Sequence, residues 1–466
     1  MSRINTNVSS LIAQRVLTKN NNSLNASLER LSTGLKINKG SDNPAGLIAS
    51  ENLRSEKAGI GQAIDNAERA SNIVGTAEGG LSEISSLLTE LTSLVGEAGN
   101  SGGLSKEEVA ANQLQVDSIL STINRIAGAT SFQGKKLLNG SLDYTTSGVA
   151  STNISDLRIN AAKLGSSESL TVDVQVIASG QTAAVSYTGG TVTSAVTIEV
   201  AGNNGTETLS FGSGTTASSI VTAVNALKDI TGVSATVDGA NVSFNSTEFG
   251  STQFVSVKAI SGGAFTTDVL RDEGVDAEVS VNGATATVDG LNVVARTGGL
   301  DVEFKLTDDF NVPGTSNFSI TGGGADFSLG SKVNYADLAS LGIAAVSTGS
   351  LGSKSGGYLN SLGTGGENAL SGENIVDAQK VVDSAIKQVA QLRGRLGAFQ
   401  KYAIGSTINN LGIALENVSA SESAIRDTDF AEETANLTRS QILSQAAQSV
   451  LAQANASPQS ALRLLQ

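Results

Sequence analysis

The segment GATSFQGKKL, from Gly128 to Leu137, contains the kinds of residue that build a nucleotide-binding phosphate loop. A phosphate loop separates its two glycines by four residues, whereas five residues lie between Gly128 and Gly134. Lys136 also stands where Ser or Thr would hold magnesium. We therefore set the segment aside as a nucleotide site.

Two acidic pairs, Asp272/Glu273 and Asp308/Asp309, offer carboxylates to a calcium ion. Neither pair has the alternating ligands of an EF-hand loop, so we interpret both as solvated surface. The chain contains no His and no Cys, which excludes disulfides, thiolate–zinc sites and His-dependent catalytic triads. Carboxylate chemistry is left open, but we expect no cofactor, no metal site and no enzyme.

The net charge of −14 is concentrated in one internal block. Residues 166–345 contain 6 basic and 19 acidic side chains, whereas the rest of the chain is almost neutral. An acidic block repels nucleic acid, so no nucleic-acid partner is expected. No apolar run approaches the ~20 residues of a membrane span, and no cleavable-signal pattern follows Met1.

Long helices must position the rest of the chain. Pro44 separates a helical segment, about Asn5 to Leu35, from a second one that begins near Ala45 and continues for about 50 residues. Ser105 and Glu108 form a capping box that begins a third helix. Apolar residues at alternating spacings of three and four predict three seams that bury one another in one bundle. The seams are Leu81, Ile84, Leu88, Leu91 and Val95; Val109, Val116, Ile119, Ile123 and Ile126, with Asn112; and Ala378, Val382, Ala385, Val389, Leu392, Leu396 and Phe399.

Both ends of the chain have a similar pattern. Because these segments are rich in Asn, Ser and Gln, each is a marginal helix alone, and we expect the two to pair with each other. Their seams are Leu24, Leu28, Leu31 and Leu35 near the start, and Leu443, Ala447, Val450 and Ala454 near the end.

The block from about 166 to 345 has a different character. Alternating runs such as LTVDVQV and VTIEV predict strands. ATVDGANV (Ala235 to Val242) and ATVDGLNV (Ala286 to Val293) agree at seven of eight positions, and each Asp-Gly predicts a hairpin. Residues Ser218 to Asp229 predict a short helix, so the block is interpreted as an inserted β-rich domain.

Two long stretches closely resemble the two ends of bacterial flagellin. They are LERLSTGLKINKGSDNPAGLIASENLRS (Leu28 to Ser55) and ANLTRSQILSQAAQSVLAQANASPQSALRLLQ (Ala435 to Gln466), and SAIRDTDFAEET (Ser423 to Thr434) fits as well. The resemblance covers roughly residues 1–140 and 370–466. The strand-helix-strand run at 196–260 also resembles the insert motif of some flagellins and hook-associated proteins.

The resemblance implies an α+β multidomain fold: a discontinuous long-helix bundle and coiled coil formed by the N- and C-terminal regions, with an inserted β-rich outer domain. It assigns 1–42 plus 425–466 to a terminal coiled coil that forms the inner tube of the flagellar filament. Residues 43–165 plus 346–424 would form the helical bundle, and 166–345 the variable surface-exposed insert.

The function implied is structural: self-assembly into a homopolymer, the extracellular filament that drives swimming. By the same resemblance, the partners are an export chaperone, the filament cap and the hook-associated proteins. Export would proceed through the flagellar secretion channel without signal cleavage, and with no membrane insertion. Two alternatives are a hook-filament junction protein, which shares the end helices, and a filament whose insert also acts as a surface or glycan-binding adhesin.

The chain ends on SPQSALRLLQ, an apolar terminal turn that needs a cover. Ser457 is a good helix N-cap and Pro458 a good first helical residue, so we expect a short helical turn or a kinked continuation. Neighbouring subunits in the filament or a chaperone would cover Leu462, Leu464 and Leu465, the alternative being that they fold back on their own bundle.

The segment LLTELTSLVGEA, from Leu87 to Ala98, resembles the part of flagellin that the toll-like receptor for flagellin recognises. The recognised form has an arginine where this chain has Glu90 and a glutamate where it has Ser93, whereas Leu94 is retained. Glu90 inverts the local charge, which predicts weak activation of the receptor by the monomer. Glu90 is alternatively a solvated helix residue or a contact between protofilaments.

Overall fold

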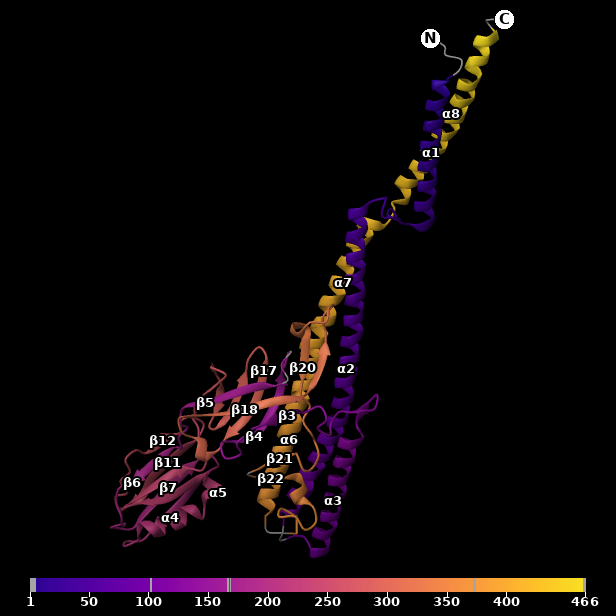
Figure 1. The fold of residues 1–466 in the computed structure, drawn as a ribbon. Coiled ribbons are helices and arrows are strands. Elements are labelled where there is room, and N and C mark those ends of the chain that lie inside the picture. Colours follow the sequence, from indigo (N-terminus) through magenta and orange to yellow (C-terminus); the bar gives the residue numbers. More distant parts are fainter. Residues whose placement is uncertain are drawn as a thin grey trace. The chain divides into compact units, whose positions relative to one another are not determined.

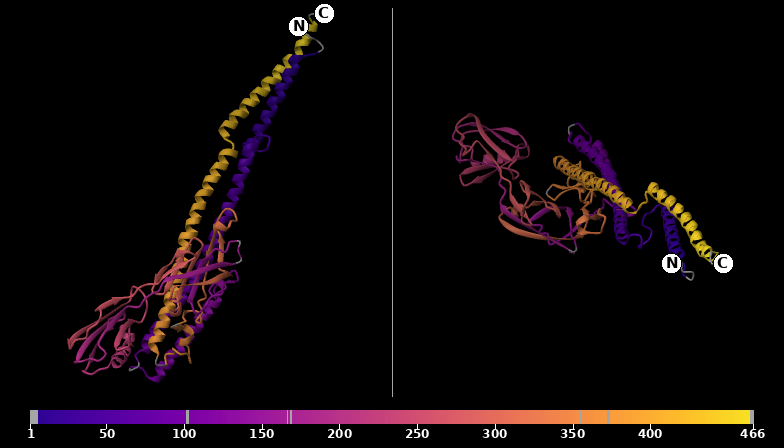
Figure 2. Two further views of the ribbon diagram at one scale, coloured as in Figure 1. Left: turned by 60° about the vertical axis from the view of Figure 1, so that its left-hand side comes forward. Right: turned by 90° about the horizontal axis from the view of Figure 1, so that it is seen from above.

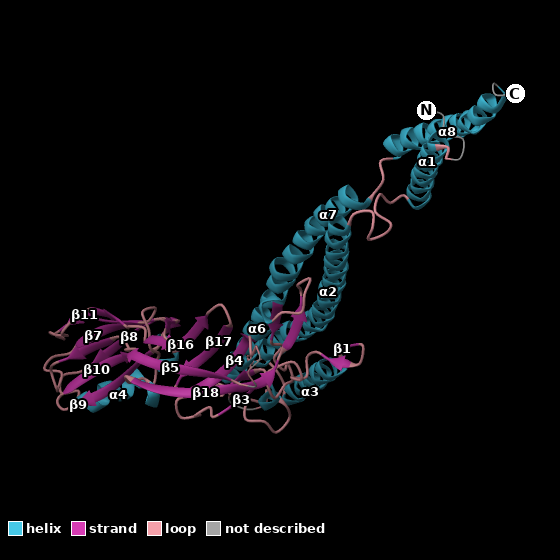
Figure 3. Cartoon of the chain, turned by 45° about the horizontal axis from the view of Figure 1, so that its top comes forward, coloured by secondary structure: helices cyan, strands magenta, loops and turns pink. Residues whose placement is uncertain are grey.

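The computed structural model describes residues 6–100, 103–165, 167, 169–354, 356–371 and 374–463. The chain divides into two compact units. Figure 1 shows the fold, coloured from the N-terminus to the C-terminus. The first unit comprises Met1–Glu68, Leu329–Val333 and Ile404–Gln466, and the second comprises Arg69–Ser328 and Asn334–Ala403. Figure 3 separates the long helices from the strands, so the α+β fold class is confirmed.

The first unit contains the helices of both chain ends. They are α1 (Val8–Thr33), α7 (Ser406–Arg426), α8 (Phe430–Arg463) and the beginning of α2 (Pro44–Ala98). The Asn7 side chain accepts a hydrogen bond from the amide of Ser10 and caps the start of α1. Gly34 ends this helix in the left-handed conformation, with φ 74°. Pro44 is the first residue of α2, so the predicted helix boundaries on both sides of it are confirmed.

The second unit contains a helical bundle. It includes the rest of α2, α3 (Lys106–Ala129), α6 (Ile375–Ala398) and a π-helical stretch, η4 (Phe399–Gly405), which continues into the first unit. The predicted capping box of Ser105 and Glu108 is confirmed. The three predicted seams are confirmed as buried, except that Val109, Ile126 and Phe399 are half-buried.

The strands of the second unit pair in antiparallel order and form two β-lobes. The first β-lobe has a five-stranded sheet, β14-β13-β5-β18-β3, and a four-stranded sheet, β15-β16-β17-β4, which share one hydrophobic core. The strands of this lobe are β3 (Tyr144–Ser147), β4 (Ile154–Ala162), β5 (Leu170–Ala178), β13 (Glu278–Val281), β14 (Ala284–Thr285), β15 (Thr287–Asp289), β16 (Asn292–Arg296), β17 (Leu300–Leu306) and β18 (Gly314–Gly323).

The second β-lobe has its own core, formed between a three-stranded sheet, β6-β10-β9, a four-stranded sheet, β12-β11-β7-β8, and helix α4 (Ala217–Asn225). The helix predicted over Ser218 to Asp229 is wrong at its end. Leu227 leaves helical geometry, with φ −110° and ψ 10°, and a separate turn, α5 (Lys228–Thr231), follows. The strands of this lobe are β6 (Ala184–Tyr187), β7 (Val196–Gly202), β8 (Thr206–Phe211), β9 (Val233–Asp238), β10 (Asn241–Ser246), β11 (Phe254–Gly262) and β12 (Arg271–Glu273).

Both Asp-Gly hairpins are confirmed, and they share one register. Asp238 pairs with Asn241 in one hairpin, and Asp289 pairs with Asn292 in the other. The first loop residue is a glycine with positive φ in each case, 62° in the first hairpin and 63° in the second. The identical octapeptide pattern therefore specifies the same local turn twice.

The segment that resembles a phosphate loop is also a hairpin, formed by β1 (Ser131–Phe132) and β2 (Lys135–Lys136). Gln133 and Gly134 between them both have positive φ. The remaining short elements are β19 (Ala325–Ser328), β20 (Leu338–Leu341), β21 (Gly352–Ser353), β22 (Gly357–Tyr358), η1 (Asp308–Phe310), η2 (Tyr335–Asp337) and η3 (Leu359–Leu362).

Candidate polymerisation surface

The two ends of the chain pair as antiparallel helices, as Figure 2 shows for α1 and α8. Asn7 Nδ2 donates to the carbonyl of Ala454 at 2.8 Å, near one end of the pair. Further along, Asn20 Nδ2 donates to the carbonyl of Leu443 at 3.1 Å. The predicted pairing of the terminal segments is confirmed.

At the other end of the helix pair, a backbone hydrogen bond and an ion pair connect the two chain ends. The amide of Thr428 donates to the carbonyl of Gly34 at 2.9 Å. Arg30 lies 3.6 Å from Glu433, whose side chain is buried beside it. Burial of the carboxylate makes this ion pair a stronger constraint than an exposed one, because removal of Arg30 would leave a desolvated charge.

The fully buried residues of α1 and α8 are mostly small or polar. Ala13, Ser27, Ser444 and Ala447 are the buried residues of this kind. Serine and alanine side chains remove little apolar area from water, so these four residues contribute little hydrophobic free energy, and half-buried leucines such as Leu24 and Leu31 contribute the rest. Hydrogen bonds from amide and hydroxyl side chains supply much of the specificity of the pair.

Nine large apolar residues of the same two helices remain exposed. We call them the terminal apolar set, and their exposed fractions range from 42% to 61%. A concentration of exposed apolar side chains on two paired helices indicates an interaction surface. The terminal apolar set consists of Val8, Leu11, Ile12, Val16, Leu28, Phe430, Ile442, Leu443 and Val450.

The residues of the two predicted terminal seams lie on α1 and α8, except Leu35, which follows the end of α1, and they differ in exposure. Ala447 is buried, and Leu24, Leu31, Leu35 and Ala454 are half-buried. Leu28, Leu443 and Val450 are exposed and belong to the terminal apolar set.

The sequence interpretation missed the apolar residues at the extreme start of α1. Val8, Ile12 and Val16 recur every four residues, and Leu11 lies beside them, which is the helical spacing that identified the other seams. Phe430 and Ile442 were also missed, because they lie outside the three- and four-residue steps counted from Leu443.

The structure at the end of the chain differs from the N-cap predicted at Ser457. Helix α8 does not begin anew at Ser457 but continues through Pro458 to Arg463, so the N-cap assigned to Ser457 is wrong. Ser457 and Pro458 follow residues that are already helical, so they lie within α8 and do not start a new helix. Leu464 and Leu465 lie outside the described residues, as does the side chain of Leu462.

A tight turn connects α1 to α2. The Asp42 carboxylate accepts hydrogen bonds from the amides of Lys39 at 2.9 Å and Asn38 at 3.0 Å, and these bonds lower the pKa of Asp42. Lys39 Nζ lies 2.8 Å from the Glu29 carboxylate, whose hydrogen bond raises the pKa of Lys39. The turn is thus fixed by charged side chains that are themselves exposed.

The receptor-recognition segment lies on α2. Glu90 and Ser93 are exposed, whereas Leu94 is buried with 7% of its surface accessible. In the described part of the chain, no group of three or more acidic side chains is placed to hold a metal ion. Within the same residues, every helix falls short of the length and apolarity required to span a membrane.

Paired terminal helices with exposed apolar residues, a helical bundle and inserted β-lobes define a class of long-helix proteins whose two chain ends pair with each other. The model of the bacterial flagellin N-terminal helical region matches residues 4–143, and that of the C-terminal helical region matches residues 379–465. The chain belongs to the bacterial flagellin family. The flagellin hook IN motif matches residues 197–248, which confirms the insert motif predicted at 196–260.

Curated relatives match the whole chain. Flagellin A of Vibrio cholerae serotype O1 is 31% identical over 475 residues, covering 99% of each chain. Flagellin B of Helicobacter pylori is 29% identical over 532 residues, covering 100% of this chain and 99% of the relative. A solved structure of FliC from Burkholderia pseudomallei is 18% identical, covers 71% of this chain and 99% of that one, and has a TM-score of 0.24.

Proposed function

We infer that the chain is the structural subunit of a bacterial flagellar filament and that it polymerises through α1 and α8. The terminal apolar set carries this inference, since nine large apolar side chains remain exposed on α1 and α8 after these helices have paired. In a helical polymer the same residues meet neighbouring copies of the chain. A contact repeated by rotation and translation does not close, so it produces a fibre.

The proposed division of labour follows the family's architecture. Residues 1–42 plus 425–466 form the inner tube, 43–165 plus 346–424 the surrounding bundle, and 166–345 the surface-exposed insert. Strands β3 and β4 belong to the first β-lobe although they precede residue 166. The segment 43–165, assigned to the bundle, therefore also supplies one strand to each sheet of that lobe.

We further propose that the chain acts without catalysis and outside the cell. Export proceeds through the flagellar secretion channel with the N-terminus uncleaved. The proposed partners are a second copy of the chain, an export chaperone, the filament cap and the hook-associated proteins. A chaperone that covers the terminal apolar set before export would prevent premature assembly.

The hook-filament junction and adhesin alternatives are not favoured. The relatives that match 99% or more of this chain are named flagellins. The abundance of the chain in isolated flagella distinguishes a major subunit from a junction protein, because a junction protein forms only a short segment of the structure.

Removal of residues 458–466 tests the polymerisation surface at the end of α8. The truncated chain should lose filament formation in sedimentation assays while its circular dichroism retains nearly all of the helical signal. The matched control carries Leu270→Ala, a change at a 65% exposed leucine of the second β-lobe, and should polymerise normally. Normal filaments from the truncated chain would contradict the assignment.

A further inference from the structure

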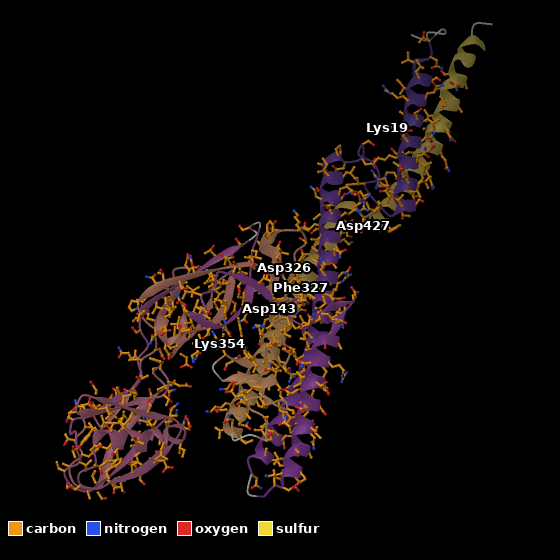
Figure 4. All side chains as sticks on the ribbon, turned by 60° about the horizontal axis from the view of Figure 1, so that its bottom comes forward. Lys19, Asp143, Asp326, Phe327, Lys354 and Asp427 are labelled. Carbon is orange, nitrogen blue, oxygen red and sulfur yellow. The ribbon has the colours of Figure 1, made fainter. Side chains whose placement is uncertain are left out.

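A cavity of about 550 Å³ lies in the second unit, a size in the range of small-molecule sites. Its walls come from α6, from β4, from the β16–β17 region and from residues 344–351. None of the lining residues belongs to α1 or α8, so the cavity is separate from the proposed polymerisation surface. Asp143, which also lines it, is labelled in Figure 4.

One part of the cavity wall is apolar. The apolar side chains are Leu157 of β4, Leu392 of α6, and Val346 and Leu351 of residues 344–351. Leu351 and Val346 are almost fully buried, so this wall is part of the packed interior. Such a wall accommodates a short hydrocarbon chain.

The acidic groups of the cavity already have partners. Arg296 lies 3.3 Å from the Asp301 carboxylate and 3.5 Å from the Glu303 carboxylate. Asp143 accepts a hydrogen bond from the amide of Tyr144 at 2.8 Å, and burial raises the pKa of Asp143. Among the described residues, none of these three carboxylates lies within ion-pair distance of Arg158 or Arg395, although their charges act on these arginines.

Arg395 of α6 is a half-buried cation whose hydrogen bonds with described residues go to neutral acceptors. Its guanidinium donates to Asn160 Oδ1 and, at 3.1 Å, to the carbonyl of Gly342. Arg395 Nε is buried and has no hydrogen-bond partner among the described residues. Asn160 is fixed in turn, since its Nδ2 donates to Asp301 at 3.0 Å.

Arg158 of β4 is the second cation of the cavity. Its guanidinium forms no hydrogen bond or ion pair with any described residue. Burial lowers the pKa of Arg158, although the charges of Asp156, Glu303 and Asp143 oppose this shift. Burial likewise lowers the pKa of Arg395, opposed mainly by Glu303 and Asp301. The nearby carboxylates therefore offset only part of the desolvation of the two guanidinium groups.

We propose that this cavity binds a small organic monocarboxylate. Arg158 and Arg395 donate to the carboxylate, and the guanidinium fork fits its two oxygens. The hydrocarbon body of the ligand lies against Leu351 and Leu392. The cavity is lined by three arginines and three carboxylates, of which Asp301 and Glu303 lie beside Arg296. Burial disfavours the ionised form of the third, Asp143, so a single negative charge suits the site better than two.

The test uses the full-length chain as a monomer, labelled with ¹⁵N-arginine. Sodium butyrate is the probe, and the Nε–Hε resonances of Arg158 and Arg395 are followed at constant ionic strength. The expected result is saturable shifts of both resonances with butyrate, and much weaker binding of inorganic phosphate and of neutral butyramide. Absence of a saturable shift, or equal binding of phosphate or butyramide, would overturn the proposal.

Variants locate the binding in the cavity. Arg158→Gln should raise the dissociation constant for butyrate about ten- to hundredfold, the usual value of hydrogen bonds to a charged group. Arg125→Gln is the matched control, because Arg125 is exposed on α3 and its loss changes the net charge equally. Arg395→Lys keeps the charge and removes the fork, so it should also weaken binding. Circular dichroism verifies the fold of each variant, and unchanged butyrate affinity in folded Arg158→Gln would refute the site.

Discussion

Replacement of Leu443 by alanine tests whether the terminal apolar set is buried in the filament. Leu443 is 47% exposed in the subunit. Complete burial of a leucine side chain is worth about 1.5–3 kcal/mol, so covering the exposed part of Leu443 would contribute about 0.7–1.4 kcal/mol per subunit. A loss of this size raises the critical concentration for polymerisation about three- to tenfold.

The assay is sedimentation of polymer from a concentration series of each chain, with the supernatant concentration at the plateau taken as the critical concentration. Leu270→Ala provides the matched control, since Leu270 is a more exposed leucine outside the terminal helices. Thermal unfolding of the monomer should change little in either variant, because each side chain is already largely in water. An unchanged critical concentration in Leu443→Ala, or an equal rise in Leu270→Ala, would refute the reasoning.

The remaining predictions concern the insert, the receptor segment and the turn before α2. Gln181 and Val275 exchange two backbone hydrogen bonds, of 2.8 and 2.9 Å, so the chain enters and leaves the second β-lobe at one place. Replacing residues 182–274 with a short Asn-Gly linker should therefore preserve both folding and sedimentable filaments. A chain that no longer polymerises would contradict this. In a receptor reporter assay the monomer should activate weakly, and Glu90→Arg combined with Ser93→Glu should increase potency; full potency of the unmodified chain would count against the prediction. Because the folded pKa of Asp42 is lowered from 3.8, its contribution to stability is present above that pH and is lost as the pH falls through the folded value. Acid unfolding of the helix ends, followed by circular dichroism, should therefore lose part of its pH dependence below 3.8 in Asp42→Asn, and identical acid curves would exclude this role.

Local features of the fold could be predicted from the sequence because each depends on neighbouring residues. The helix start at Pro44 follows from the fixed φ of proline. The turns at Gly239 and Gly290 follow from the positive φ that glycine accepts. The seams that include Leu88 and Val389 follow from their three- and four-residue spacing, which places their apolar side chains on one helix face.

Other features depend on contacts between distant residues, which spacing does not reveal. Asn160 and Arg395 lie 235 residues apart and meet only after β4 and α6 have packed in the second unit. Of the two alternatives for the chain end, a new helical turn and a continuation, the structure shows continuation of α8 through Pro458, and the sequence could not decide between them because Ser457 is a favourable N-cap residue. The exposure of Leu443 and Val450 could not be read from their seam either, because the same spacing describes contact within one chain and contact between chains.

Electron microscopy of the purified chain after salt-induced polymerisation tests the central claim most directly. A helical reconstruction should show filaments whose inner wall is formed by residues 8–33 and 430–463, with the terminal apolar set against neighbouring subunits. Filaments with these two helices exposed to solvent, or failure of the purified chain to form filaments in polymerising salt, would contradict it.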